Sequence, residues 1–231
     1  MKKLSLKSSA VLLLIMLLGV SVASATPITI LNASFEQVSG TYGTNLVNGH
    51  WTVGEGSTGL AGWTYSGDGM YGNWAPAGGL YTASVPDGSY IGALHAGSLI
   101  QMLDWVVSAN NLFTLSIDIG NRTDMAFPEY SVQLLAGNAV LASSGAVAPA
   151  EGLFSTLTLS YTALDGDANL GQYLGIQIVS QGPHLNFDNV RLTNDSIERP
   201  VNAVPEPSTL ILLGAGMLCL AGYGRKHFKK P

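Results

Sequence analysis

The sequence predicts an all-β protein built as an antiparallel β-sandwich, and three features support this prediction. Apolar and polar residues alternate with a period of two in several segments of residues 28–193, as in strands with one buried face. Glycine-rich turns separate these segments. No segment shows a convincing apolar period of 3.6 residues, the pattern of an amphipathic helix. Short strands at fairly regular spacing are typical of a sandwich.

The alternation is clearest in residues 113–119, where Phe113, Leu115 and Ile117 are separated by polar residues. The same pattern predicts strands over residues 130–134, 157–161 and 174–178. Weaker strand candidates are residues 28–32, 62–65, 80–84, 90–94 and 99–103. The glycine-rich residues 41–79 read as a long loop, of the kind that carries function or simply connects.

The last predicted strand, residues 184–193, changes its buried face part-way along. Leu185 and Phe187 share one face, whereas the next apolar pair, Val190 and Leu192, falls on the other. Because side chains alternate strictly along a strand, such a change requires a bulge or a strong twist. We expect this irregularity at Asp188 and the residue after it.

The N-terminus has the layout of a secretory signal peptide. Three lysines precede an apolar run over residues 10–20, and the small-residue pattern Ala23-Ser24-Ala25 follows it. Cleavage after Ala25 and export through the Sec machinery are therefore expected, with a signal helix over residues 1–25. The remaining chain divides into a sandwich domain over residues 26–193, a polar linker over residues 194–203 and a C-terminal segment over residues 204–231.

The C-terminal segment joins an extended acidic motif, an apolar run and a basic tip. The motif is Val204, Pro205, Glu206 and Pro207, whose prolines favour an extended, accessible backbone. Residues 210–223 contain no charge and predict a transmembrane helix, although fourteen residues fall short of the roughly 20 that usually span a membrane. Four lysines and arginines follow and suit an anionic cytoplasmic interface.

This order resembles the PEP-CTERM sorting signal of Gram-negative bacteria that make exopolysaccharide. The resemblance implies recognition by the membrane protease exosortase and a transient hold in the inner membrane. Cleavage near residues 204–207 would then release the protein to the cell surface or the exopolysaccharide matrix. A plain tail anchor is the alternative, although it has no need of Pro-Glu-Pro before the helix.

Charge and cysteine content narrow the possible partners of the exported part. In residues 26–204, fourteen acidic residues stand against three arginines, which gives a net charge of −11 with no lysine. Such a surface repels nucleic acid and anionic membranes but tolerates divalent cations and neutral polymers. The single cysteine, Cys219, lies in the apolar run, so the domain has neither a disulfide nor a cysteine nucleophile.

Three short motifs of the domain together resemble the galactose-binding-like jelly roll, the fold of many carbohydrate-binding modules. They are Asn-Ala-Ser-Phe-Glu at residues 32–36, Gly62-Trp63, and Asn-Phe-Asp-Asn-Val at residues 186–190. The resemblance implies a structural Ca²⁺ held by Glu36 and Asp188 with backbone carbonyls, a ligand set that suits this ion. Alternatively, both acids accept hydrogen bonds from backbone amides in turns.

Glycan binding would need exposed aromatic rings beside polar side chains. The candidates are Trp51, Asp68, Tyr71, Asn73 and Trp74, all in the predicted long loop. The alternative is that these aromatic residues pack as a lid on the sandwich.

Catalytic patterns are weak. No Gly-x-Ser-x-Gly motif is present, and Asp165 and Asp167 bracket a glycine as in a turn rather than a cleft. The sequence therefore favours a non-enzymatic, structural or adhesive surface protein. A calcium-stabilised carbohydrate-binding module, with exopolysaccharide as a partner, is the alternative, and a secreted hydrolase ranks third.

Overall fold

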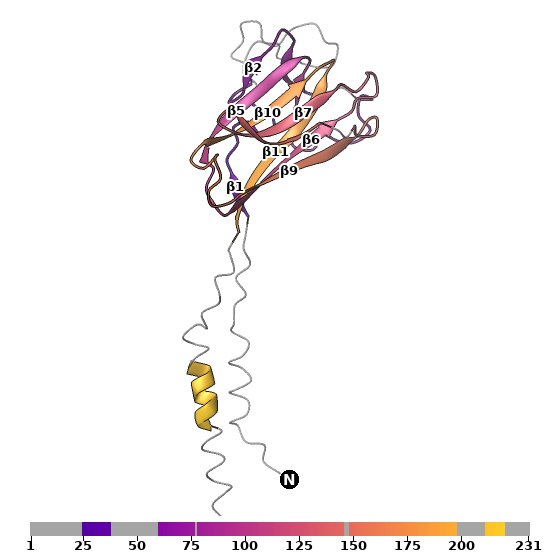
Figure 1. The fold of residues 1–231 in the computed structure, drawn as a ribbon. Helices are drawn as coiled ribbons and strands as arrows, with labels where there is room; N and C mark the ends of the chain where they lie inside the picture. Colours follow the sequence, from indigo (N-terminus) through magenta and orange to yellow (C-terminus); the bar gives the residue numbers. More distant parts are fainter. Residues whose placement is uncertain (1–24, 38–59, 77, 146–147, 198–210, 220–231) are drawn as a thin grey trace, which may run out of the picture. The chain divides into compact units, whose positions relative to one another are not determined.

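The computed structural model describes residues 25–37, 60–76, 78–145, 148–197 and 211–219. The chain forms two units, residues 1–196 and residues 197–231, and each is described by itself. Eleven strands are found among the described residues, all of them in the first unit (Figure 1). Every pairing between them is antiparallel, so the predicted antiparallel β-sandwich is confirmed.

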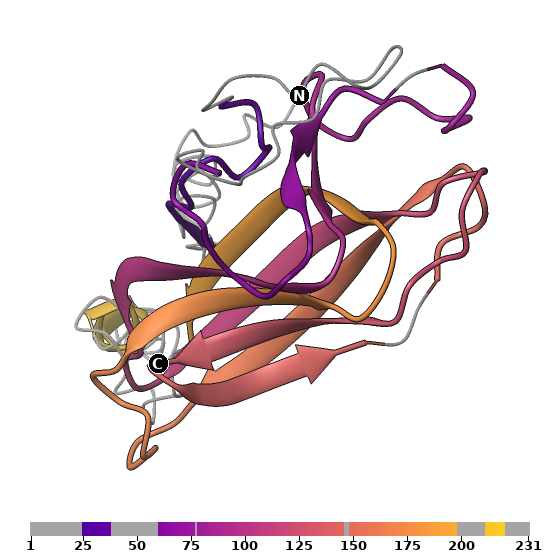
Figure 2. The same cartoon turned by 90° about the horizontal axis from the view of Figure 1, so that it is seen from above.

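The strands form two sheets (Figures 1 and 2). The six-stranded sheet has the order β3 (Tyr71–Trp74), β4 (Ile91–Leu94), β11 (Leu185–Ser196), β6 (Asn111–Gly120) and β9 (Phe154–Ala163), with β1 (Thr26–Ile28) also pairing β11. The five-stranded sheet has the order β2 (Thr64–Ser66), β5 (Gly97–Val106), β10 (Tyr173–Ser180), β7 (Tyr130–Ala136) and β8 (Ala139–Ser144).

The main hydrophobic core lies between the sheets and contains the inward residues of the alternating strands, among them Phe113, Leu115, Val132, Leu134 and Ile176. Burial of these large side chains is the main force that holds the sheets together.

A second, smaller cluster lies on the outer face of the six-stranded sheet. It consists of Trp74, Ile91 and Ala93, against which Leu80, Tyr81, Val85 and Phe154 pack. The alternation in β4 places this cluster on the outer face. Gly92 points inward, so Ile91 and Ala93 on either side of it point outward. A Cβ atom on Gly92 would lie 2.2 Å from the ring of Phe187, which belongs to the main core. Residues 80–85 therefore cover the outer face of this sheet.

The most regular predicted strands correspond to β6, β7, β9 and β10. The weaker prediction over residues 80–84 is wrong, because this segment forms bends and irregular structure with no strand. Its apolar residues pack on the outer face of a sheet instead of extending one. The predicted loop over residues 41–79 is also wrong in part, since β3 lies within it and pairs with β4.

Two predicted boundaries shift. The strand predicted over residues 28–32 ends at Ile28, because the chain then crosses to β5, where Leu31 bonds to the side chain of Gln101. At the other end, β11 runs to Ser196 and enters the predicted linker.

The predicted irregularity in the last strand is confirmed. The register between β11 and β6 shifts between Asp188 and Arg191, and Asn189 adopts a positive φ of 53°. Phe187 and Val190 can therefore both be buried in the main core, one on each side of the bulge. The bulge leaves Asp188 on the outer face.

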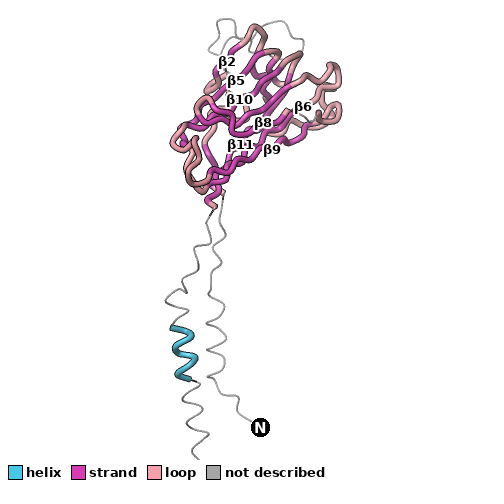
Figure 3. The backbone as a smooth tube through the Cα atoms, viewed as in Figure 1, coloured by secondary structure: helices cyan, strands magenta, loops and turns pink. Residues whose placement is uncertain are grey.

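The second unit contains a helix over residues 211–219 (Figure 3). It lies within the predicted apolar run, whose last residues fall outside the described part. Among the described residues, no helix is long and apolar enough to cross a membrane. The predicted signal helix and the motif from Val204 to Pro207 also lie outside the described residues.

Candidate functional site

The outer face of the six-stranded sheet holds a buried carboxyl group beneath residues 80–90. We call this area the covered face; it comprises Asp118, Asp188, Asn186, Tyr81 and Trp74. Asp188 has no exposed surface, although it is an acid on the outer side of a sheet. Burial of a carboxyl group is costly unless it is hydrogen-bonded or protonated, so this residue requires an explanation.

Two backbone amides hold the Asp188 carboxyl group. The N–H of Asp87 donates to Oδ2 at 2.9 Å, and the N–H of Asn189, placed by the bulge, donates to Oδ1 at 2.7 Å. These bonds lower the pKa of Asp188, but burial raises it more, and the net result is a pKa of about 7. The group can therefore hold or release a proton near neutral pH.

Asp118 lies opposite Asp188 in the register of β6 and β11 and carries its own set of partners. Thr156 Oγ1 donates to its Oδ1 at 2.5 Å, and Asn189 Nδ2 donates to its Oδ2 at 2.9 Å. Arg191 approaches the same oxygen at 3.4 Å. The charge of Asp118 is one of the smaller causes that raise the pKa of Asp188.

Aromatic side chains lie on the same face of the sheet as this carboxyl pair. The hydroxyl of Tyr81 donates to Asn186 Oδ1 at 2.9 Å, and the ring of Tyr81 stacks on Phe154 with centroids 4.5 Å apart. Trp74 is 2% exposed, and the guanidinium of Arg122 lies 4.9 Å from the centre of its ring. Burial raises the pKa of Tyr81, so its hydroxyl stays protonated. The covered face thus combines an apolar aromatic layer with a titratable acid.

Glu36 fixes the segment that covers Asp188. Its Oε1 accepts hydrogen bonds from the N–H groups of Ser89 at 2.7 Å and Tyr90 at 2.6 Å. Gly88 makes this possible, because a Cβ atom there would lie 2.3 Å from Glu36 Oε1 and its φ is +69°. Glu36 and Asp188 therefore bind the same short segment, residues 87–90.

This arrangement fits the predicted calcium pair only in part. The two acids meet at one segment, as a shared ion would require, but both oxygens of Asp188 and Oε1 of Glu36 already accept backbone amides. Within the described ranges, no group of three or more acidic, histidine or cysteine side chains could hold a metal ion. The hydrogen bonds match the alternative reading of both residues as amide acceptors, and calcium binding stays a prediction.

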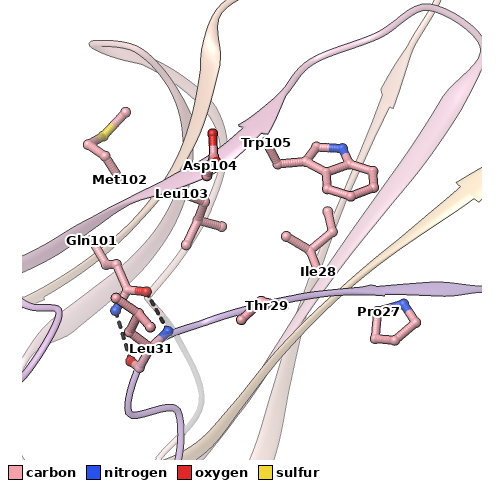
Figure 4. Close-up of a pocket in the computed structure, with 9 residues that line it drawn as sticks. All are labelled: Pro27, Ile28, Thr29, Leu31, Gln101, Met102, Leu103, Asp104 and Trp105. Carbon is pink, nitrogen blue, oxygen red and sulfur yellow. Dashed lines mark hydrogen bonds between the residues drawn. The ribbon is translucent and has the colours of Figure 1, made fainter.

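An open pocket of about 510 Å³ lies elsewhere, between β1 and β5 at an edge of the sandwich (Figure 4). Ile28, Leu103 and Trp105 form its apolar lining, and Gln101 binds the backbone of Leu31 through both ends of its amide, at 2.8 and 3.0 Å. Within Figure 4, Met102 and Asp104 point away from β1. The pocket contains none of the residues of the covered face.

The predicted glycan residues separate in the structure. Trp74 and Asn73 are buried in β3, and Asn73 donates to the carbonyl of Phe35 at 2.6 Å. Tyr71 is half-buried and stacks on Tyr65 with centroids 4.2 Å apart. Asp68 is exposed, and Trp51 lies outside the described residues. The described aromatic members therefore pack against the domain, as the lid alternative expects.

Sequence reasoning found Glu36 and Asp188 but missed Asp118, Tyr81 and Asn186. Asp118 reads as an ordinary polar residue in an alternating strand, and only the pairing with β11 places it beside Asp188. Tyr81 lies 105 residues before its partner Asn186, so no local pattern links them. The signals that found the two acids were the motifs at residues 32–36 and 186–190 and the change of buried face at Asp188.

Comparisons with known proteins identify two matches along the chain. A family model described as HpiC1 cyclase matches residues 26–193, and a PEP-CTERM protein-sorting motif matches residues 203–226. The sorting motif implies an exported protein that exosortase processes. No curated protein matches the chain.

Solved structures give the same family relation. The chain is 29% identical to a Stig cyclase, Fisc, from Fischerella sp. TAU in complex with an indole compound; the match covers 76% of this chain and 100% of that one, with a TM-score of 0.65. A cyclase from the same organism, in complex with 4-(1H-indol-3-yl)butan-2-one, is 28% identical over 76% of this chain and 100% of its own, with a TM-score of 0.64.

A xylan-binding domain from Paenibacillus barcinonensis is a more distant structural neighbour. It is 14% identical over 61% of this chain and 90% of its own, with a TM-score of 0.40, and carries no argument about function. The cyclase matches contradict the prediction of a non-enzymatic protein, because the matched family and solved structures are enzymes.

Replacing Asp188 with asparagine should remove a pH dependence of stability. The folded-state pKa of about 7 lies above the ordinary 3.8, so between these values the folded protein holds a proton that the unfolded chain has lost. The free energy of unfolding must therefore fall as pH rises through this window and reach its low value above pH 7. We expect the wild type to lose on the order of 2 kcal/mol more than D188N between pH 5 and pH 8, measured by urea unfolding.

The control is D104N, which removes an exposed carboxylate from the other sheet. Its pH dependence should match the wild type. Equal slopes for the wild type and D188N would contradict the raised pKa.

Proposed function

The chain belongs to the HpiC1-like cyclase family, and from this membership we propose that it is an exported enzyme that closes a ring on a small apolar aromatic substrate by acid catalysis. Asp188 is the proposed acid. One observation carries the assignment: a carboxyl group with no exposed surface lies on the same face of the sheet as the cluster that contains Trp74, Tyr81 and Phe154. The pKa of about 7 supports it, because such a group is partly protonated at neutral pH.

Acid-catalysed ring closure needs few groups. A proton adds to a carbon–carbon double bond of the substrate, an electron-rich aromatic carbon attacks the resulting cation, and that ring carbon then loses a proton. The carboxylate left on Asp188 takes this proton back, so the product is an isomer of the substrate and the acid is regenerated. The only nucleophile is the aromatic carbon of the substrate, so the protein supplies no nucleophile and no oxidant, which agrees with the weak catalytic patterns in the sequence.

The surrounding aromatic residues suit a cationic intermediate. The faces of Trp and Tyr rings attract positive charge by about 0.5–2 kcal/mol. Trp74 already has a cation over its face, the guanidinium of Arg122. Tyr81 and Phe154 form a stacked wall of the same cluster. An apolar lining also limits the capture of the cation by water.

Substrate reaches Asp188 if the covering segment lifts. Residues 78–90 contain no helix or strand, and Asp87, Gly88 and Ser89 are exposed on their outer side. Three hydrogen bonds from backbone N–H groups hold this segment against the two acids. The N–H of Asp87 donates to Asp188, and the N–H groups of Ser89 and Tyr90 donate to Glu36. Opening therefore breaks a small number of bonds at one end of a short loop, as in many enzyme lids.

The identity of the relatives' ligands supports the substrate class. The two Fischerella structures are complexes with indole compounds. An indole has an electron-rich ring carbon that can attack a cation, so an indole with an unsaturated side chain is the proposed type of substrate.

The test uses an indole that carries an alkene on its side chain and follows its conversion to an isomer of equal mass by chromatography with mass spectrometry. We expect turnover by the wild type and a loss of about 100-fold or more in D188N, the usual range for removing a general acid. The rate should fall as pH rises above about 7, because the acid form is then depleted.

D104N is the matched control and should retain wild-type turnover, because Asp104 lies on the other sheet. Full activity of D188N would exclude this residue as the acid. No isomerisation by any variant, combined with no binding of 4-(1H-indol-3-yl)butan-2-one by calorimetry, would overturn the proposed substrate class.

The finer course of export is also a proposal. Residues 1–25 would direct the chain through the Sec machinery and be removed after Ala25. The apolar run of residues 210–223 would then hold it in the inner membrane until exosortase cuts near Val204 to Pro207, leaving the domain at the cell surface or in the matrix. The sorting motif supports the second step.

Intact-mass measurement of the protein released from the producing cell tests this course. We expect a chain that begins at Thr26 and lacks residues 211–231. A released chain that keeps the basic C-terminus would contradict processing at the motif.

Calcium binding is a second candidate role for Glu36 and Asp188. It is incompatible with the role of Asp188 as the catalytic acid. A calcium ligand must be ionised, whereas a resting acid must be protonated. Calcium would replace amide donors in the bonds that now hold residues 87–90.

Thermal unfolding after EDTA treatment separates the two roles. If calcium binds, adding it back raises the melting temperature of the wild type, and neither E36Q nor D188N responds. An unchanged melting temperature in the wild type would remove calcium from this pair. D68N, which changes an exposed acid elsewhere, is the control.

A further inference from the structure

Two histidine side chains meet beside the covered face. Leu94 of β4 pairs with Leu185 of β11, and both leucines belong to the main core. The next residues along this register are His95 and His184, so their side chains belong to the outer side of the six-stranded sheet. Their ring centroids are 5.3 Å apart, and the ring planes are perpendicular, at 90°. The fold therefore brings together two imidazoles from distant parts of the sequence.

A methionine extends this row onto the neighbouring strand. Tyr71 of β3 pairs with Leu94, and the N–H of His95 donates to the carbonyl of Met70 at 2.7 Å, which continues the register by one residue. Met70 therefore lies beside His95 on the same side of the sheet, because residues directly opposite in antiparallel strands share a face. Met70 is 42% exposed, and its side chain is long and flexible. The row presents one thioether and two imidazoles.

The backbone of His184 has a conformation that is rare for residues other than glycine. Its φ is 53°, in the left-handed region. Glycine adopts this region without strain, so a turn that served only to lead the chain into β11 would favour glycine at this position. Residues that persist in such conformations are concentrated at functional sites. The strain indicates that the imidazole of His184 has a use.

The charge state of His184 suits a metal ligand. Burial, followed by the positive charge of Arg122, lowers the pKa of His184 to about 4. The imidazole is therefore neutral at neutral pH, and metal ions bind the neutral form. Arg122 forms an ion pair with Asp124 at 2.7 Å, which offsets part of the positive charge near the ring.

We propose that His95, His184 and Met70 bind one copper ion in its cuprous state, Cu(I). Imidazole suits copper, and a thioether selects Cu(I) over harder ions such as Ca²⁺. A monovalent ion is also repelled less than a divalent one by the guanidinium of Arg122. Among the described residues, no metal site can be built from acidic, histidine and cysteine side chains alone, and the third ligand here is a methionine.

The separation of the two rings suits a shared ion. A trigonal or tetrahedral ion at the usual metal–imidazole distance of about 2.0–2.1 Å would hold the two ring centroids about 5.1–5.5 Å apart. The observed centroid separation is 5.3 Å. Binding therefore requires rotation of the rings about their side-chain bonds but no movement of β4 or β11. The acidic domain also attracts cations to its surface.

Titration of the full chain in detergent tests this site, with Cu(I) kept reduced by ascorbate under argon and a coloured Cu(I) chelator as competitor. We expect one tightly bound ion per chain. H95Q and H184N should each weaken Cu(I) binding about 100-fold or more, and M70L about tenfold, because each variant removes one ligand. Asparagine is chosen at position 184 because it tolerates the left-handed backbone.

M102L is the matched control for M70L. Met102 has a similar exposure of 47% but lies on β5 of the other sheet, so M102L should bind Cu(I) as the wild type does. X-ray absorption at the copper edge identifies the ligands: the wild type should show nitrogen and sulfur neighbours, and M70L should lose the sulfur. Circular dichroism should show that all the variants are folded.

Three results would overturn the proposal. A wild type that cannot take Cu(I) from the chelator would reduce the histidine pair to a packing contact between rings. Equal Cu(I) affinities of the wild type, H95Q and H184N would place the ion elsewhere. Tighter binding of Zn²⁺ than of Cu(I), with no effect of M70L, would exclude the copper assignment. Ring closure by Asp188 is measured in none of these titrations, so this inference and the proposed enzymatic function can fail separately.

Discussion

The bulge in β11 at Asp188 and Asn189 is the constraint on which the architecture and the proposed site both depend. β11 pairs with β4, β6 and β1, so it is the central strand of the six-stranded sheet. Its core residues, Phe187 and Val190, reach the same interior only because the strand shifts register between them. The same shift turns the N–H of Asn189 toward the Asp188 carboxyl group and brings the Asn189 side chain to Asp118. One irregularity therefore serves packing and the placement of an acid.

The sequence predicts the fold well wherever one face of a strand is buried. The strands β6 and β10 alternate regularly because the main core covers one side of each. The edge strand β8 is largely exposed and carries little alternation, so it has no such signal. β3 is missed for a different reason: both of its faces are covered, and Gly72 and Asn73 interrupt its apolar pattern. Residues 80–84 mislead because their apolar side chains pack onto a sheet without joining it.

The candidate site could be predicted only where a local motif marks it. Asp188 is marked by the change of face, and Glu36 by the motif that contains it. Tyr81 and Asn186 meet only in three dimensions, through a loop whose course no local pattern defines. The chemical role of the two acids is harder to predict than their position. Two acids that accept hydrogen bonds from backbone amides look the same in sequence whether they transfer a proton or bind an ion. The enzymatic class entered through family membership, since the residues show no familiar catalytic motif.

The pairing of β1 with the end of β11 has a mechanical consequence. Thr26 pairs with Asn194 and Ile28 with Leu192, so both ends of the domain leave from the same pole of the sandwich. A pulling force applied across these ends would act perpendicular to the strands and open the short ladder one bond at a time from Thr26, as a zipper does. A load carried by one end alone leaves this ladder unstressed. A load applied across both ends would therefore separate β1 from β11 before it disturbs the other strands.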